Sequence, residues 1–131
     1  MIQESPGFRK VPVSQTKAGD WIRLAPSGGR DYDVIVRSSS LRSIDGPVLV
    51  LAGKSVPRAF ADDGWPPGST PNVRVLEVDG SWGGAGVERR IWIHNERSGR
   101  WGHWNERGEL QFGRGPCAHD LDGVYRPRRE P

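Results

Sequence analysis

Glycine and proline divide this chain into short segments, and their spacing limits the possible folds more than any other feature. The 18 glycines and 11 prolines are scattered without a repeating period, which argues against a collagen-like repeat. The longest apolar run, residues 48–52, is far shorter than the roughly 18 to 20 residues that a membrane-spanning helix needs. The sequence therefore predicts short elements joined by tight turns, and no membrane partner.

The size of the chain predicts a single domain. Its 131 residues, of which 34% are hydrophobic, can form one compact unit but not two. We expect a β domain over residues 11–124. Residues 1–10 lack periodicity and predict an N-terminal arm, and residues 125–131 form a charged, proline-punctuated tail that cannot bury a face. Both ends are expected to lie outside the core.

Alternation of apolar and polar residues predicts the individual strands. Ile22 and Leu24 are expected to face inward together, and residues 32–37 alternate as a half-buried strand does. Residues 73–78 predict a further strand. Residues 48–51 are continuously apolar, which predicts a central strand covered on both faces and the heart of the core.

One short helix and a C-terminal meander complete the expected elements. Residues 55–63 predict one or two helical turns, with Ser55 as the cap and Pro57 in the first turn. Three short strands separated by glycine-containing turns predict a three-stranded meander, at residues 91–96, 100–104 and 109–112.

These elements indicate an all-β fold. Short strands with tight turns and at most one short helix favour a small SH3-like barrel or a two-sheet sandwich, carrying the C-terminal meander. The phrase Lys17-Ala-Gly-Asp-Trp-Ile resembles the turn and strand that open many SH3-like barrels. The resemblance implies a small closed barrel.

Cysteine usage and the N-terminus bear on localisation. The single cysteine, Cys117, cannot form an internal disulfide, which favours a reducing compartment. Glu4 and Pro6 stand where a secretory signal would place its basic and apolar regions. We expect a protein that is cytoplasmic or assembled into a particle, and not exported by a cleaved signal peptide.

Histidine and cysteine supply the atom types of a zinc site but not the spacing. Paired zinc ligands usually lie close together on a turn, and only Cys117 and His119 do so, while His94 and His103 can meet only across a hairpin. Cys117 also lacks the marks of a nucleophile with an oriented base. The sequence predicts no metal and no cofactor.

Other catalytic patterns are incomplete. Asp62 and Asp63 beside Trp65 are the best local candidate for a hydrolase, but Asp-Asp-Gly is also ordinary turn chemistry. The glycine-rich loop at residues 80–86 lacks the Gly-Lys-Ser/Thr ending of a phosphate-binding loop. We expect no enzymatic activity.

Tryptophan and arginine supply the candidate binding surface. Six tryptophans exceed what a small core can bury with every indole N–H satisfied, so some are expected on the surface. Trp92 alternates with Ile91 and Ile93 and therefore faces out if those two face the core. Alternatively, Trp92 packs with Trp101 and Trp104 in a second small core. The predicted binding residues, for protein or nucleic acid, are Trp65, Trp82, Arg90, Trp92, Arg97, Arg100, Trp101, Trp104 and Arg107.

Three function classes remain at this stage. Tryptophan and arginine are enriched in interface hot spots, which favours a non-catalytic β-barrel module that docks onto protein surfaces in a larger assembly, such as a phage-like virion component or a homo-oligomer. A nucleic-acid-binding module is the alternative. Its support is a pI near 9.5, but the net charge of +3 is evenly dispersed and forms no basic stripe. A small hydrolase or metal-dependent enzyme is the third class.

Overall fold

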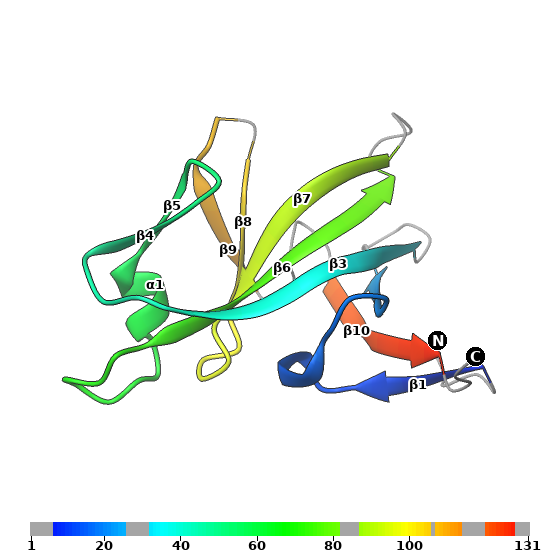
Figure 1. The fold of residues 1–131 in the computed structure, drawn as a ribbon, viewed down its shortest axis with the longest axis horizontal. Helices are drawn as coiled ribbons and strands as arrows, with labels where there is room; N and C mark the ends of the chain where they lie inside the picture. The colour runs from blue at the N-terminus through cyan, green and yellow to red at the C-terminus, as the bar shows by residue number, and fades with distance from the viewer. Residues whose placement is uncertain (1–6, 26–31, 82–86, 106, 114–119, 128–131) are drawn as a thin grey trace.

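One large antiparallel sheet dominates the computed structural model (Figure 1), which describes residues 7–25, 32–81, 87–105, 107–113 and 120–127. Eight strands pair in the order β1-β10-β2-β3-β6-β7-β8-β9. Their bounds are β1 (Phe8–Val11), β2 (Trp21–Ala25), β3 (Tyr32–Ser43), β6 (Asn72–Ser81), β7 (Val87–His94), β8 (Trp101–Trp104), β9 (Leu110–Gly113) and β10 (Asp120–Pro127).

The remaining elements are small. A separate hairpin joins β4 (Val48–Leu51) to β5 (Lys54–Pro57), and α1 (Arg58–Asp62) follows it directly. A 3-10 turn, η1 (Val13–Gln15), precedes β2. No helix within the described ranges is long and apolar enough to cross a membrane.

The all-β prediction is confirmed, but the closed barrel is not found. Within the described residues the sheet ends at β1 on one side and at β9 on the other, and these two strands do not pair with each other. The reason lies in β3 and β6, which are 12 and 10 residues long and pair over most of their length. These long strands carry one sheet from end to end of the molecule (Figure 1).

The sheet is buried on opposite faces at its two ends. Val73 and Val75 of β6 pack into one cluster, whereas Leu76 and Val78 pack into another, and odd and even residues of a strand face opposite ways. Core A consists of Val11, Ile22, Leu24, Val34, Val36, Leu76, Val78, Trp92, Trp101 and Val124. Core B consists of Ile44, Leu51, Val56, Phe60, Ala61, Val73, Val75, Ile93 and Trp104. The strands that contribute side chains to both cores are thus β6, β7 and β8.

The run at residues 48–51 is not the central strand that the sequence predicted. It forms β4, which pairs only with β5 among the described strands. Val48 and Val50 are 48% and 58% exposed, and only Leu51 of this strand is fully buried in core B. A continuous apolar run does not reveal which segments will pack against it. Here one face of the hairpin covers core B, and the other face is exposed to solvent.

The predicted arm and tail both contribute to the sheet. β1 pairs with β10 in the register Phe8 with Pro127 to Val11 with Val124, so the expected boundaries at residues 10/11 and 124/125 fall inside strands. Backbone hydrogen bonds hold these segments, and such bonds require no apolar periodicity. In addition, Arg126 donates to Asp20, which is only 1% exposed.

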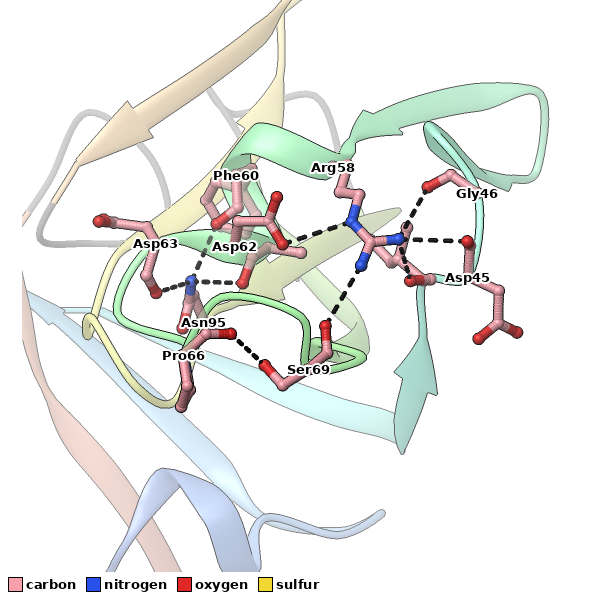
Figure 2. A network of polar contacts seen from close by, with 11 residues as sticks. Asp45, Gly46, Arg58, Phe60, Asp62, Asp63, Pro66, Ser69 and Asn95 are labelled. Carbon is pink, nitrogen blue, oxygen red and sulfur yellow. Dashed lines mark hydrogen bonds and ion pairs between the residues drawn. The ribbon is translucent and has the colours of Figure 1, made fainter.

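The short helix lies within the predicted residues 55–63, but its start differs. Ser55 belongs to β5 and does not cap α1, whose N-cap position is Pro57. Figure 2 shows how Arg58 links this helix to the loop before β4 and to the loop before β6. Its guanidinium lies 3.4 Å from the carboxylate of Asp62 and donates to the carbonyl oxygens of Ile44, Asp45, Gly46 and Ser69.

Asn95 ties the other end of α1 to the meander (Figure 2). Its side-chain amide donates to the carbonyl oxygens of Phe60, Ala61 and Asp63 at 2.9, 3.3 and 2.9 Å. Its Oδ1 accepts the backbone N–H groups of residues 97 and 98 in the turn that leads to β8. Asn95 is fully buried, and these bonds satisfy its amide completely.

Candidate binding groove

A groove of about 700 Å³ opens where the hairpin tip faces the large sheet. Three parts of the chain line it. They are the tip of the β4–β5 hairpin (Ala52 and Lys54), the middle of β6 and β7 (Glu77, Arg89, Arg90, Ile91 and Trp92) and the end of β8 with the residue after it (His103, Trp104 and Asn105).

The groove exists because β7 and β8 separate. Within the described residues they pair only through Ile93 with Gly102 and His94 with Trp101, and Figure 1 shows the two strands leaving this junction at an angle. Gly102 permits the close approach, since a Cβ there would lie 3.0 Å from the side chain of Ile93. Beyond the junction β8 stays paired with β9, while β7 continues alone beside β6.

The separation leaves one edge of β7 open. From Trp92 back to Val87, β7 has β6 on one side and no described strand on the other. The backbone N–H of Asn95 donates to the carbonyl oxygen of Arg100, so the backbone groups of Asn95 point toward β8. In a strand, the backbone groups of every second residue point to the same edge. The N–H and C=O groups of Ile91 and Arg89 therefore point toward the groove.

Charged side chains line the groove. Lys54, Arg89 and Arg90 line it with three positive charges, against one carboxylate from Glu77. Arg89 is 63% exposed and lies 3.3 Å from Asp79.

The carboxylate of Asp79 is shared by two arginines. Asp79 also accepts a 2.6 Å hydrogen bond from Arg37, and this bond, followed by that from Arg89, holds the pKa of Asp79 below its usual range against the opposing effect of burial. The guanidinium groups of Arg37 and Arg89 thus bind the same carboxylate.

His103 adds a neutral ring to the groove. Burial lowers the pKa of His103, and the nearby charge of Arg90 lowers it further. The imidazole is therefore uncharged at neutral pH, and it can both donate and accept a hydrogen bond.

The expectation that Trp92 faces solvent is wrong. Trp92 has no exposed surface, and it packs with Trp101 in core A, while Trp104 packs in core B. Ile93 is buried in core B, as expected. However, the opposite face of β7 packs in core A, so Trp92 does not meet solvent. The alternative of one second core is also incomplete, because the three rings belong to two cores.

The structure divides the remaining predicted binding residues among separate places. Arg90 lines the groove with Trp92 and Trp104. Arg97 and Arg100 lie elsewhere, with their guanidinium carbons 4.7 and 4.8 Å from the ring centres of Trp65 and Phe112. Arg107 is exposed in the turn between β8 and β9, and Trp82 lies outside the described residues.

The candidate acidic pair does not converge on a cleft. Asp62 faces Arg58 at 3.4 Å, and Asp63 faces Arg100 at 3.5 Å. Among the described residues no three His, Cys, Asp or Glu side chains are grouped to hold a metal ion, and Cys117 and His119 lie outside those residues.

Comparisons with protein-family models, curated proteins and solved structures find no match to this chain. The groove must therefore be interpreted from its own chemistry.

Because of His94, the last residue of β7, we expect the protein to lose stability in acid. Its ring lies 4.4 Å from that of Trp101, and burial lowers the pKa of His94 from 6.5 to about 4, with Glu96 opposing and Arg74 adding to the shift. The unfolded chain binds a proton between these two values and the folded chain does not. The free energy of unfolding therefore has its full value above about pH 6.5, and it falls by about 3 kcal/mol as the pH is lowered to 4.

Urea denaturation at pH 7, 5.5 and 4 measures this effect. The His94→Gln variant removes the titrating ring, so its free energy of unfolding should change less between pH 7 and pH 4 than that of the wild type. Parallel pH profiles for the two proteins would contradict the assignment.

Proposed function

We propose that the protein is a non-catalytic module that docks onto a protein partner within a larger assembly. It does so by taking an extended segment of that partner into the groove, as a strand added to β7. The observation that carries the proposal is the open edge of β7 from Val87 to Trp92, which borders the groove.

Strand addition suits this arrangement. Main-chain hydrogen bonds along an open edge provide affinity for any extended chain, and pockets for alternate side chains provide selectivity. The backbone groups of Ile91 and Arg89 point toward the edge, and the hairpin tip at Lys54 forms the opposite wall. A groove of about 700 Å³ accommodates a few side chains of such a strand.

The burial of Trp92, Trp101 and Trp104 disfavours nucleic acid as the occupant of the groove. Proteins that bind single strands present exposed aromatic rings on which bases stack. Trp92, Trp101 and Trp104 are 0%, 2% and 8% exposed, and their rings are packed in the two cores. The groove thus offers a strand edge and cations without a stacking platform.

Selection from a library of random peptides of about ten residues tests the proposal, since this length matches the longer natural strands. Peptides that bind the wild type should bind the Ile91→Trp variant at least about tenfold more weakly, because the larger ring fills the groove floor. Val50→Trp is the matched control, as Val50 is 58% exposed and lies outside the groove.

N-methylated versions of a selected peptide test whether its backbone pairs with the edge of β7. Methylating alternate amide nitrogens of a selected peptide removes the donors on one of its edges, so one set of methylations should abolish binding and the other should not. Equal effects of the two sets, or an absence of peptides that depend on the groove, would contradict strand addition. Tight oligonucleotide binding that weakens steeply with salt would favour the nucleic-acid class instead.

The assembly context is tested separately by size. We expect the chain to migrate in large particles in its native extract, as a component of a virion or similar assembly would. A chain found there only as a free monomer would contradict this part of the proposal.

A further inference from the structure

We infer that two copies of this chain pair through the outer edge of β4, the edge that faces away from β5. Among the described strands, β4 pairs only with β5. Figure 1 shows the hairpin at the end of the molecule opposite β1 and β10. No residue of β4 lines the groove, so this surface is separate from the one in the proposed function and adds a second contact to it.

The hydrogen bonds of the hairpin show which backbone groups of β4 are not used by β5. The N–H of Arg58 donates to the carbonyl oxygen of Pro47 at 2.9 Å, and this pair continues the β4–β5 register. In an antiparallel pair of strands, every second residue bonds to the neighbouring strand, and the residues between them point their backbone groups away from it. The N–H and C=O groups of Val48 and Val50 therefore point to the outer edge of β4.

The other edge of the hairpin is already engaged. The carbonyl oxygen of Ser55 in β5 accepts a 3.4 Å hydrogen bond from Nε1 of Trp104 in β8. Pro57, the last residue of β5, has no N–H to donate to a further strand. A further strand therefore extends the hairpin beside β4.

The side chains of β4 suit a second copy because none of them is charged. Val48 and Val50 are 48% and 58% exposed, while Leu49 is half-buried against core B. Edge strands are commonly protected from pairing by charged side chains, by proline or by a bulge, and the four residues of β4 include none of these. Two copies with a net charge of +3 thus meet at β4 without like charges on opposite strands.

The pattern of open backbone groups also sets the register of the pair. When two antiparallel copies are centred on Leu49, Val48 of one copy lies opposite Val50 of the other, and each such pair exchanges two hydrogen bonds. An identical strand therefore matches the open groups of β4 without a shift of register. The valines pack together on the exposed face, and the arrangement has a two-fold axis, so it closes as a dimer.

Sedimentation of the full chain over a range of concentrations tests the inference. Because the shared edge is short, we expect a dimer with a dissociation constant on the order of 100 μM. The Val50→Lys variant should raise this constant at least about tenfold, because a charged side chain would have to be buried against a valine. Leu41→Lys is the matched control, since Leu41 is 47% exposed on β3 and the same change there should leave the constant unchanged.

Disulfide cross-linking tests the register. In a Cys117→Ser background, Leu49→Cys places two thiols directly opposite each other, with Cβ atoms about 4.5 to 5.5 Å apart, close to the spacing in a disulfide. Val50→Cys places them on a diagonal, about 7 to 8 Å apart. Under mild oxidation Leu49→Cys should therefore form the linked dimer several-fold faster, although residue 50 is the more exposed.

Four results would overturn the inference. They are a chain that stays monomeric at about 1 mM, equal weakening of the dimer by Val50→Lys and Leu41→Lys, faster cross-linking through Val50→Cys, and a dimer that Ile91→Trp dissociates, which would place the contact at β7. Binding of peptides to the groove should be the same in Val50→Lys as in the wild type, because residue 50 lies outside it. Failure of self-association thus leaves the docking function standing, and failure of peptide binding leaves the dimer standing.

Discussion

Replacing Trp92 with alanine should reduce the free energy of unfolding by about 3 to 5 kcal/mol, the range for removing a large aromatic side chain from a packed interior. Trp92 has no exposed surface, and it lies in core A opposite Leu76 of the neighbouring strand. The cavity would open at the centre of the sheet, where β6 and β7 are covered on both faces and little collapse is possible.

Urea denaturation of the Trp92→Ala variant checks this expectation, with Val50→Ala as a control that should cost less than about 0.5 kcal/mol because Val50 is 58% exposed. The sequence-based hypothesis of an exposed anchor predicts the opposite result, a stable domain that loses its partner. A cost near that of the control would restore that hypothesis.

Replacing Arg126 with leucine should cost a similar amount, about 3 to 5 kcal/mol, because breaking a buried ion pair leaves the other charge without compensation. Arg126 Nε donates to Asp20 Oδ1 at 2.8 Å, and the exposed fractions of the two side chains are 12% and 1%. Arg126 also donates to the carbonyl oxygen of Gln15 at 2.8 Å. These bonds fasten β10 to the segment before β2.

Arg23→Leu is the matched control. Arg23 and Asp33 form an ion pair whose side chains are 32% and 33% exposed, and exposed pairs contribute less than about 1 kcal/mol. Thermal or urea unfolding of the two variants should therefore separate clearly. Similar midpoints for both would mean that the C-terminal segment contributes little to stability, as expected of a tail that lies outside the core.

Local patterns predicted most of the strands correctly. Ile22 and Leu24 are buried in core A as expected, and the meander appears as β7, β8 and β9. The helix also falls where it was expected, within residues 55–63. Each of these features depends on side-chain alternation or on turn residues a few positions apart, which the sequence displays directly.

The candidate site was predicted only in part. Arg90, Trp92 and Trp104 line the groove and were among the predicted binding residues, whereas Lys54 and Arg89 were not. Nothing in the local sequence marks Lys54, because it reaches the groove only when the hairpin folds against the sheet. The groove is a product of strand separation, which depends on pairing between distant segments.

The sequence by itself determined that this chain is a set of short antiparallel strands with one short helix, because period, turn chemistry and apolar content are local properties. Only the tertiary structure decided which faces meet water. Alternation in β7 shows that Trp92 and Ile93 point in opposite directions, but it cannot show that a core covers each of them. Burial is a property of what packs against a strand, and here β2, β3 and β10 supply one cover while the hairpin and α1 supply the other.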